Sequence, residues 1–134
     1  LAEQVAKLQT NSNSCTATFI QYAGIAALDG PQDESEAMMA QFKQRRDIMV
    51  AGLNQIPGIS CLLPAGAFYV FPNVTGCADP CDVLARRCLE EAGVAVLSGT
   101  AFGRYGEGYL RLSSANSIEN IQEGLRRIEQ MLTA

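Results

Sequence analysis

The sequence contains no histidine and no tryptophan among its 134 residues. Without imidazole it has no Ser/His/Asp or Cys/His catalytic pair and no histidine-ligated zinc or haem. Lys7 and Lys43 are the only lysines, and both fall at exposed-looking helical positions. An amine that forms a Schiff base needs a desolvated pocket. Any chemistry must therefore rest on carboxylates, arginine, tyrosine, serine or cysteine.

Long hydrophobic runs and an excess of basic charge are also absent. No apolar run approaches the ~20 residues that a membrane helix needs, so we expect no membrane partner. Lys and Arg number 10 against 14 Asp and Glu, which gives a net charge of −4 and a pI near 4.7. This balance disfavours a surface that follows phosphates, and we expect no nucleic-acid partner.

The five cysteines are an odd number in a chain long enough to fold without disulfides. Reduced thiols, and with them a cytoplasmic location, fit this usage best. Three residues separate Cys77 from Cys81, and no second pair stands at zinc-ribbon spacing, so no metal site is expected. A thiol redox centre at this pair is an alternative that would need a thiolate of low pKa. Cys88 falls on an apolar helical position and is predicted to fill the core.

Helical periodicity dominates both ends of the chain. The start looks like a helix already under way, which suggests a fragment, and residues 10–14 read as a polar cap or loop. Further helices are expected over 16–28 and over 32–55, the second with an apolar stripe formed by Met38, Phe42, Met49 and Leu53. Another helix is expected between an Asp79 N-cap, with Pro80 as its first residue, and a C-terminal cap at Gly93. The last is expected over 118–132, with Ser117 as its N-cap.

Between these helices the apolar period changes to that of strands. Strands are expected over 59–63 and 67–71, joined by a short glycine turn, and over 94–97 and 108–112. This order of elements predicts an α+β fold, a two-layer sandwich in which helices pack on a small, mostly antiparallel sheet. No internal repeat or linker divides the chain, so one domain is the default.

Arg111 stands inside an apolar strand, where alternation puts Tyr109, Arg111 and Ser113 on one face and Leu110 and Leu112 on the other. The simpler interpretation, which the pattern alone favours, is an arginine that reaches out from a sheet edge or pairs with a structural carboxylate. The alternative is a guanidinium that offers its planar fork to the carboxylate of a ligand.

Two glycine-containing segments are also candidates for ligand binding. In the turn before the strand over 67–71, the backbone at Gly66 could approach a ligand that Phe68 covers, although such a segment is more often core. The glycines between 99 and 108 match no nucleotide-binding fingerprint and precede a strand, so they are predicted to form a flexible turn.

Four segments together resemble the C-terminal small domain of the fold-type-I, pyridoxal-phosphate-dependent aminotransferases, in the aspartate aminotransferase superfamily (class I/II). The matching segments are Thr10–Ala23, Pro64–Pro72, Gly93–Gly99 with Phe102–Gly103, and Gly108–Ala115. They stand in the order and at the spacing of the family, so the resemblance covers nearly the whole chain. Ser98 departs from it, since many relatives have proline there.

The resemblance implies specific roles. Arg111 would bind the α-carboxylate of the amino-acid substrate, and Phe68 would line the same cleft. The loop around Ser12 and Ser14 would lie near the interface of a homodimer. Residues 1–134 would form a single C-terminal small domain of a larger enzyme, with residues 1–28 as a remnant of the interdomain helical region.

The other partners would be the large domain of the same polypeptide, an amino acid and a 2-oxo acid. The lysine that holds pyridoxal 5'-phosphate belongs to that large domain in the family, so the fragment alone should bind no cofactor and should not transaminate. Two hypotheses follow: a substrate-binding domain of an aminotransferase, or a naturally short, non-catalytic α+β module that binds a small carboxylate or a protein.

Overall fold

The computed structural model describes residues 1–13 and 15–133. Ser14, which the resemblance assigns to an interface loop, lies outside the described residues. By its internal contacts the chain divides into two compact units, Leu1–Ala37 and Met38–Ala134. Among the described residues, no helix has both the length and the apolar character needed to cross a membrane.

The first unit contains helices α1 (Ala2–Ser12) and α2 (Thr18–Asp29). The helix expected at the start of the chain is confirmed, but it runs through Thr10–Ser12, which were predicted to be a cap or loop. The side chains of Thr10 and Asn11 donate hydrogen bonds to the carbonyls of Ala6 and Lys7, four residues earlier, so these polar residues continue the helix.

Helix α3 (Asp33–Leu53) begins in the first unit and ends in the second, close to its predicted bounds. Three acidic residues stand in its first turn, where the helix dipole favours negative charge. The predicted apolar stripe is correct only near the C-terminal end. Met49 and Leu53 are buried there, whereas Met38 is 59% exposed.

The sheet of the second unit has the strand order β1-β3-β2, with both pairs antiparallel, which confirms the predicted α+β class. β1 is Tyr69–Val70, β2 is Leu97–Ser98 and β3 is Leu110–Ser113. Each strand is shorter than predicted or shifted from its predicted bounds. The register places Tyr69 opposite Ser113 and Leu97 opposite Arg111.

The strand expected over 59–63 is reduced to a single bridge between Ser60 and Asn73. The Asn54 side chain explains this result. Its amide accepts a hydrogen bond from the Cys61 backbone N–H at 2.8 Å and donates one to the Cys61 carbonyl at 2.9 Å. A residue whose backbone groups bond to a side chain in this way does not use them in a ladder.

The remaining helices are α4 (Cys81–Glu90) and α5 (Ile118–Thr133). The Ser117 cap is confirmed, because the Asn120 N–H donates to its hydroxyl at 3.2 Å. The predicted Asp79 cap is wrong: Pro80 takes the N-cap position, and Asp79 pairs with Arg87 at 2.6 Å instead. The carboxylate is therefore used in a tertiary ion pair.

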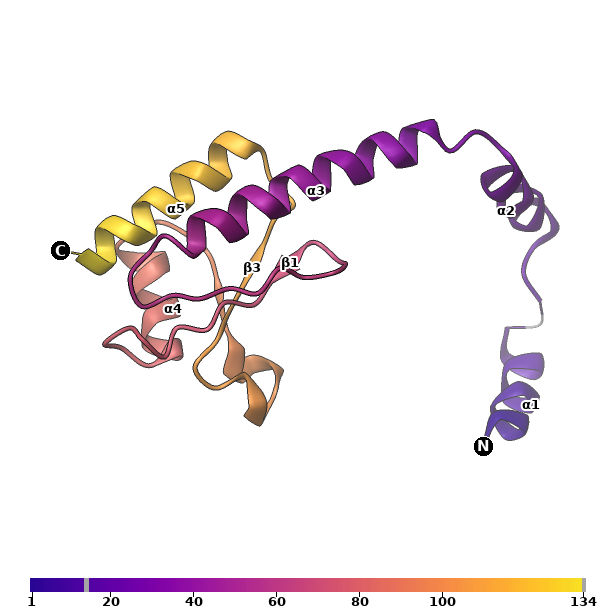
Figure 1. The fold of residues 1–134 in the computed structure, drawn as a ribbon. Coiled ribbons are helices and arrows are strands. Elements are labelled where there is room, and N and C mark those ends of the chain that lie inside the picture. Colours follow the sequence, from indigo (N-terminus) through magenta and orange to yellow (C-terminus); the bar gives the residue numbers. More distant parts are fainter. Residues whose placement is uncertain (14, 134) are drawn as a thin grey trace. The chain divides into compact units, whose positions relative to one another are not determined.

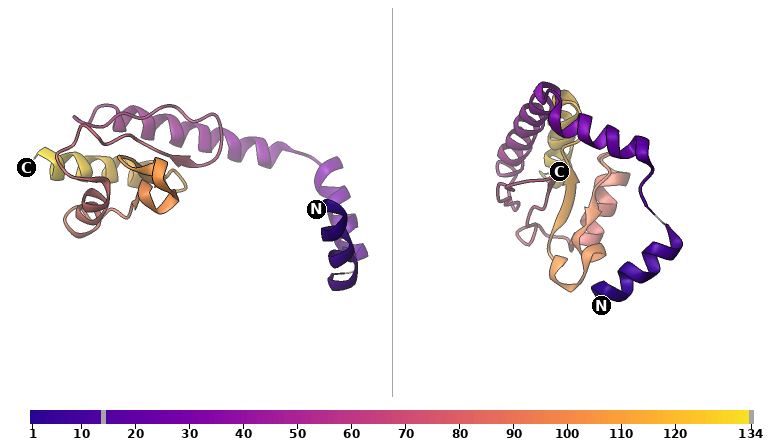
Figure 2. Two further views of the ribbon diagram at one scale, coloured as in Figure 1. Left: turned by 90° about the horizontal axis from the view of Figure 1, so that it is seen from below. Right: turned by 90° about the vertical axis from the view of Figure 1, so that its right-hand side faces the viewer.

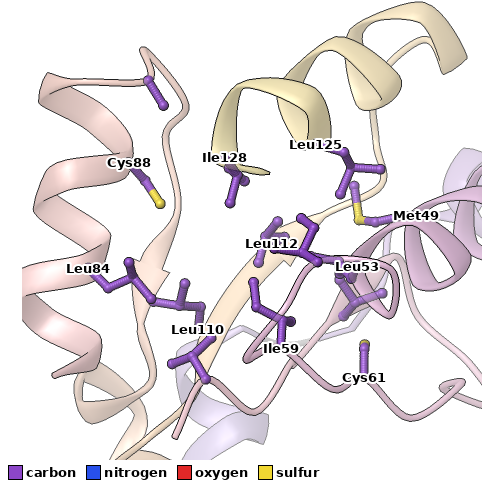
Figure 3. Close-up of a cluster of buried hydrophobic side chains, with 14 of the residues drawn as sticks. Met49, Leu53, Ile59, Cys61, Leu84, Cys88, Leu110, Leu112, Leu125 and Ile128 are labelled. Atoms are coloured by element: carbon purple, nitrogen blue, oxygen red, sulfur yellow. The ribbon is translucent and has the colours of Figure 1, made fainter. Parts of the chain in front are cut away.

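A single core holds the second unit together (Figure 3). α3, α4, α5 and one face of the sheet all direct buried side chains into it; these include Leu53, Val70, Leu84, Cys88, Leu110, Leu112, Leu125 and Ile128. The C-terminal part of α3 and α5 lie side by side (Figures 1 and 2), so close that a Cβ at Gly52 would stand 2.6 Å from the Leu125 side chain. The opposite face of the sheet is the more exposed one.

Candidate functional site

Arg111 lies on the more exposed face of the sheet, in the middle of β3. Its neighbours Leu110 and Leu112 are buried, whereas Arg111 is half-buried, so the predicted alternation is confirmed. β3 is the central strand of the sheet. The interpretation of Arg111 as an arginine at a sheet edge is therefore wrong.

The guanidinium of Arg111 forms no ion pair and no hydrogen bond with any part of the chain that the structure describes. The described arginines that do form ion pairs are Arg46, Arg87, Arg126 and Arg127. A guanidinium carries five N–H donors in a planar fork and keeps its charge at neutral pH. The donors of Arg111 are thus available to an acceptor from outside the described residues.

Two aromatic rings hold the Arg111 guanidinium. Its central carbon lies 4.4 Å from the centre of the Tyr69 ring and 4.5 Å from that of Phe102. Both distances are within the range of a cation–π contact. Tyr69 belongs to β1, on one flank of β3, and Phe102 ends the 3-10 helix η1 (Gly99–Phe102), which follows β2 on the other flank.

Phe68, the second residue proposed for the site, is joined to Arg111 through Tyr69. The Phe68 and Tyr69 ring centres are 4.5 Å apart, and Phe68 is 42% exposed. The Phe68 carbonyl accepts hydrogen bonds from the backbone N–H and the hydroxyl of Ser114, at 2.8 and 3.2 Å. Its backbone is thereby fixed, while its ring stands at the surface.

The turn before Phe68 differs from the expected glycine turn. The residue with a left-handed backbone is Ala67, at φ 60°, and Gly66 has a negative φ. A Cβ added to Gly66 would meet no atom within 4 Å, so the space beside this backbone is open.

The loop between β2 and β3 is ordered by close glycine contacts, where a flexible turn was predicted. It forms η1 and a second 3-10 helix, η2 (Arg104–Gly106). Gly99 and Gly106 touch through their backbones, and a Cβ on either would collide with the carbonyl oxygen of the other. The Gly99 N–H also donates to the Tyr109 carbonyl at 2.8 Å. These contacts fix the segment that carries Phe102.

The Phe102 ring packs next to Phe71, which in turn packs on Tyr109. Phe71 stacks on Tyr109 with ring centres 5.2 Å apart and meets Phe102 edge-on at 6.2 Å. Sequence reasoning missed Tyr69 and Phe102 as neighbours of Arg111. Strand alternation could have placed Tyr69 on the same face. No sequence pattern predicts that the loop would bring Phe102 there.

The lysines do not suit covalent binding of pyridoxal phosphate. The Lys7 side chain is 65% exposed and pairs with Glu3 at 3.3 Å, and Lys43 is exposed on α3. Neither stands in the desolvated pocket that a Schiff-base lysine needs. Lys7 and Lys43 are therefore not suited to form the covalent link to that cofactor.

Cys77 and Cys88 also lack the surroundings of a redox nucleophile. Burial, followed by the nearby charge of Asp79, raises the pKa of Cys77, and burial raises that of Cys88 to about 11. A redox nucleophile needs the opposite direction of pKa shift. Cys81 and Cys88 are buried in the core, as predicted for Cys88. In the described ranges, no group of three or more Cys, Asp or Glu could hold a metal ion.

A cavity of about 330 Å³ lies beside α5 and is lined in part by Val94, Val96, Leu112, Asn120 and Arg127. Arg111 and Phe68 do not line it. The candidate site is thus a feature of the open sheet face and is separate from this cavity. A ligand at Arg111 would remain in contact with water unless another surface covered it.

Comparison with known proteins gives a consistent result. A family model described as aminotransferase class I and II matches residues 1–128. The chain is 42% identical over 132 residues to an aspartate aminotransferase of Pyrococcus horikoshii, covering 97% of this chain and 34% of that protein. It is also 42% identical over 136 residues to a probable aspartate/prephenate aminotransferase of Aquifex aeolicus, with 98% and 34% covered.

Solved structures agree with these relatives. The aromatic aminotransferase of Pyrococcus horikoshii superposes with a TM-score of 0.88 at 36% identity, covering 98% of this chain and 35% of that one. The alanine aminotransferase of Pyrococcus furiosus gives 0.88 at 35% identity, with 98% and 34% covered. The chain thus spans about a third of the length of the relatives that it matches.

Proposed function

We propose that this chain, which belongs to the class I and II aminotransferase family, is the C-terminal small domain of a longer, pyridoxal-phosphate-dependent aminotransferase. In that enzyme Arg111 binds the α-carboxylate of an amino acid and of a 2-oxo acid. One observation carries the assignment: Arg111 stands on the central strand between two rings, and its donors meet no acceptor among the described residues.

The chemistry of the guanidinium supports this role. A carboxylate accepts two parallel hydrogen bonds from the fork of an arginine, which fixes the direction of the substrate as well as its position. The central strand gives Arg111 a rigid base, since hydrogen-bonded strands lie on both sides of it. The exposed rings of Phe68, Tyr69 and Phe102 supply apolar surface that can exclude water from the bound carboxylate.

The rest of the enzyme lies outside this chain in our proposal. The large domain supplies the lysine and the other groups that hold the cofactor, and it closes over the sheet face when substrate binds. A homodimer in the cytoplasm is the assembly that the family resemblance supports. The 134 residues alone are then expected to show no transamination.

The relatives' names leave the substrate's side chain open. They refer to aspartate, aspartate/prephenate, aromatic and alanine aminotransferases, and these proteins match the chain about equally well. We therefore propose an amino acid as the substrate class and assign no particular side chain.

The test is Arg111→Ala in the full-length protein that contains this sequence. Loss of a desolvated charge contact costs about 2 kcal/mol or more, so kcat/KM for the amino acid should fall at least about thirtyfold. Arg126→Ala is the matched control, because Arg126 is 51% exposed on α5 and pairs with Glu123. An unchanged kcat/KM in Arg111→Ala would refute the assignment.

The length of the natural polypeptide separates the two hypotheses from the sequence. Intact-mass analysis should give a protein about three times as long as this chain, in line with the coverage of its relatives. That protein should also show the absorption of a bound pyridoxal cofactor. A natural 134-residue protein without the cofactor would favour the short binding module.

A further inference from the structure

The guanidinium of Arg111 is held from two sides by side chains that follow different strands. Tyr69 comes from β1, and Phe102 comes from the 3-10 helix after β2, while Arg111 stands on β3 between them. The two distances, 4.4 and 4.5 Å, are nearly equal. Both rings contact the guanidinium as a π-system, which leaves its in-plane N–H donors free for another partner.

These two contacts reduce the conformational freedom of the Arg111 side chain, which has no carboxylate partner among the described residues. An arginine has several rotatable bonds, and ordering them when a ligand binds reduces the affinity. A side chain already ordered by its surroundings avoids that cost. Among the described residues, Arg111 has no hydrogen-bond or ion-pair partner for its guanidinium, and the two rings are what hold it.

The position of Phe102 is itself fixed. The backbones of Gly99 and Gly106 are in contact, and the Gly99 N–H donates to the Tyr109 carbonyl, so the 3-10 helix is tied to the base of β3. Phe71 meets the Phe102 ring edge-on at 6.2 Å. Phe102 nevertheless keeps half of its surface exposed, at 50%. A ring so firmly held and so exposed contributes little to the core.

We propose that Tyr69 and Phe102 are positioning residues, which hold the guanidinium of Arg111 ready for a carboxylate. The proposal rests on the proposed function of Arg111 as the carboxylate-binding residue. Neither ring touches the reacting atoms in this proposal. Their contribution is to affinity and should not extend to the rate of the chemical step.

The experiment uses the full-length protein and the variant Phe102→Leu, which keeps an apolar side chain but removes the aromatic face. Propionate is the probe, because it carries a carboxylate and no reactive amine, and propionamide is its neutral counterpart. The Kd of propionate should rise about two- to fivefold, the ratio that corresponds to an exposed cation–π contact. KM for the amino acid should rise by the same factor while kcat stays unchanged.

Two further variants separate positioning from a general structural effect. Phe102→Tyr restores an aromatic face and should restore the wild-type Kd. Tyr105→Leu is the matched control, because Tyr105 is 82% exposed in the neighbouring 3-10 helix and contacts Arg104 rather than Arg111. It should leave the Kd unchanged. Tyr69→Leu should act in the same direction as Phe102→Leu.

The outcomes distinguish the two proposals. If Arg111→Ala weakens propionate binding and Phe102→Leu does not, the positioning role is refuted and the function of Arg111 stands. A fall in kcat together with a rise in KM, or a failure of Phe102→Tyr to rescue, would show a structural role and also refute positioning. If Arg111→Ala leaves propionate binding unchanged, the proposed function itself fails.

Discussion

The packing of α4 can be tested with two leucines on the same helix. Leu84 is 1% exposed and belongs to the core of the second unit, whereas Leu89 is 57% exposed. Replacing either by alanine changes helix propensity by the same small amount, so the difference between the variants measures burial. Leu84→Ala should destabilise the chain by about 3 kcal/mol, the usual cost of a cavity left by a buried leucine. Leu89→Ala should change stability by less than about 0.5 kcal/mol.

The assay is urea unfolding of the 134-residue chain, followed by far-ultraviolet circular dichroism. With a slope of about 1–3 kcal/mol per molar urea, Leu84→Ala should lower the midpoint by about 1 M or more. Leu89→Ala should leave the midpoint close to that of the unmodified chain. Equal losses in the two variants would mean that the buried face of α4 is assigned wrongly.

Three further predictions concern the loop, an ion-pair cluster and the thiols. Gly99→Ala should destabilise the chain by about 1–3 kcal/mol in urea, because its Cβ would collide with the Gly106 carbonyl oxygen and stand 2.8 Å from that of Tyr109. The hydrogen bonds from Arg126 and then Arg127 hold the pKa of Glu123 at about 2, below its ordinary value of 4.5. Because the folded pKa is the lower one, this stabilisation is present above about pH 4.5 and is lost as the pH falls toward 2. Glu123→Gln should therefore reduce the decline of folding stability between pH 4.5 and 2. An unaltered decline would contradict the ion pairs. Iodoacetamide at pH 7 should modify the exposed Cys15 and spare Cys88, which is fully buried with a pKa near 11, until urea unfolds the chain; mass spectrometry of the digested chain decides.

The helices could be predicted from the sequence because their signals are local. The Ser117 cap and the spacing of Ile121, Leu125 and Ile128 place α5 almost to the residue, and all three apolar side chains are buried. Cys88 was predicted as core on the same periodic ground and is fully buried.

The strands were predicted less well because their bounds depend on distant partners. Residues 59–63 have the alternation of a strand, but the Asn54 side chain takes the backbone groups of Cys61. Val94 and Val96 read as strand residues, yet the ladder with β3 contains only Leu97 and Ser98. Residue pattern alone cannot show which backbone groups find a partner across the chain.

Part of the candidate site followed from strand alternation, and part did not. Arg111 was placed correctly on the face opposite Leu110 and Leu112, and its contact with Tyr69 is of the kind that period-2 geometry can anticipate. Phe102 reaches Arg111 through a loop whose path is set by the contact of Gly99 with Gly106. The sequence pattern of these glycines predicts only a flexible turn and does not predict the contact between them.

The uncommitted donors of Arg111 and the exposure of the surrounding rings have a common explanation. Tyr69 and Phe71 are each 39% exposed and Phe102 is 50% exposed, although aromatic side chains are the largest source of apolar burial in a core. A guanidinium–carboxylate pair is weak while water surrounds it and strengthens as water is excluded. Rings that flank the guanidinium at the surface supply that exclusion only when a second surface covers them. The open sheet face therefore fits the role that we propose for it, in which a second domain closes over bound substrate.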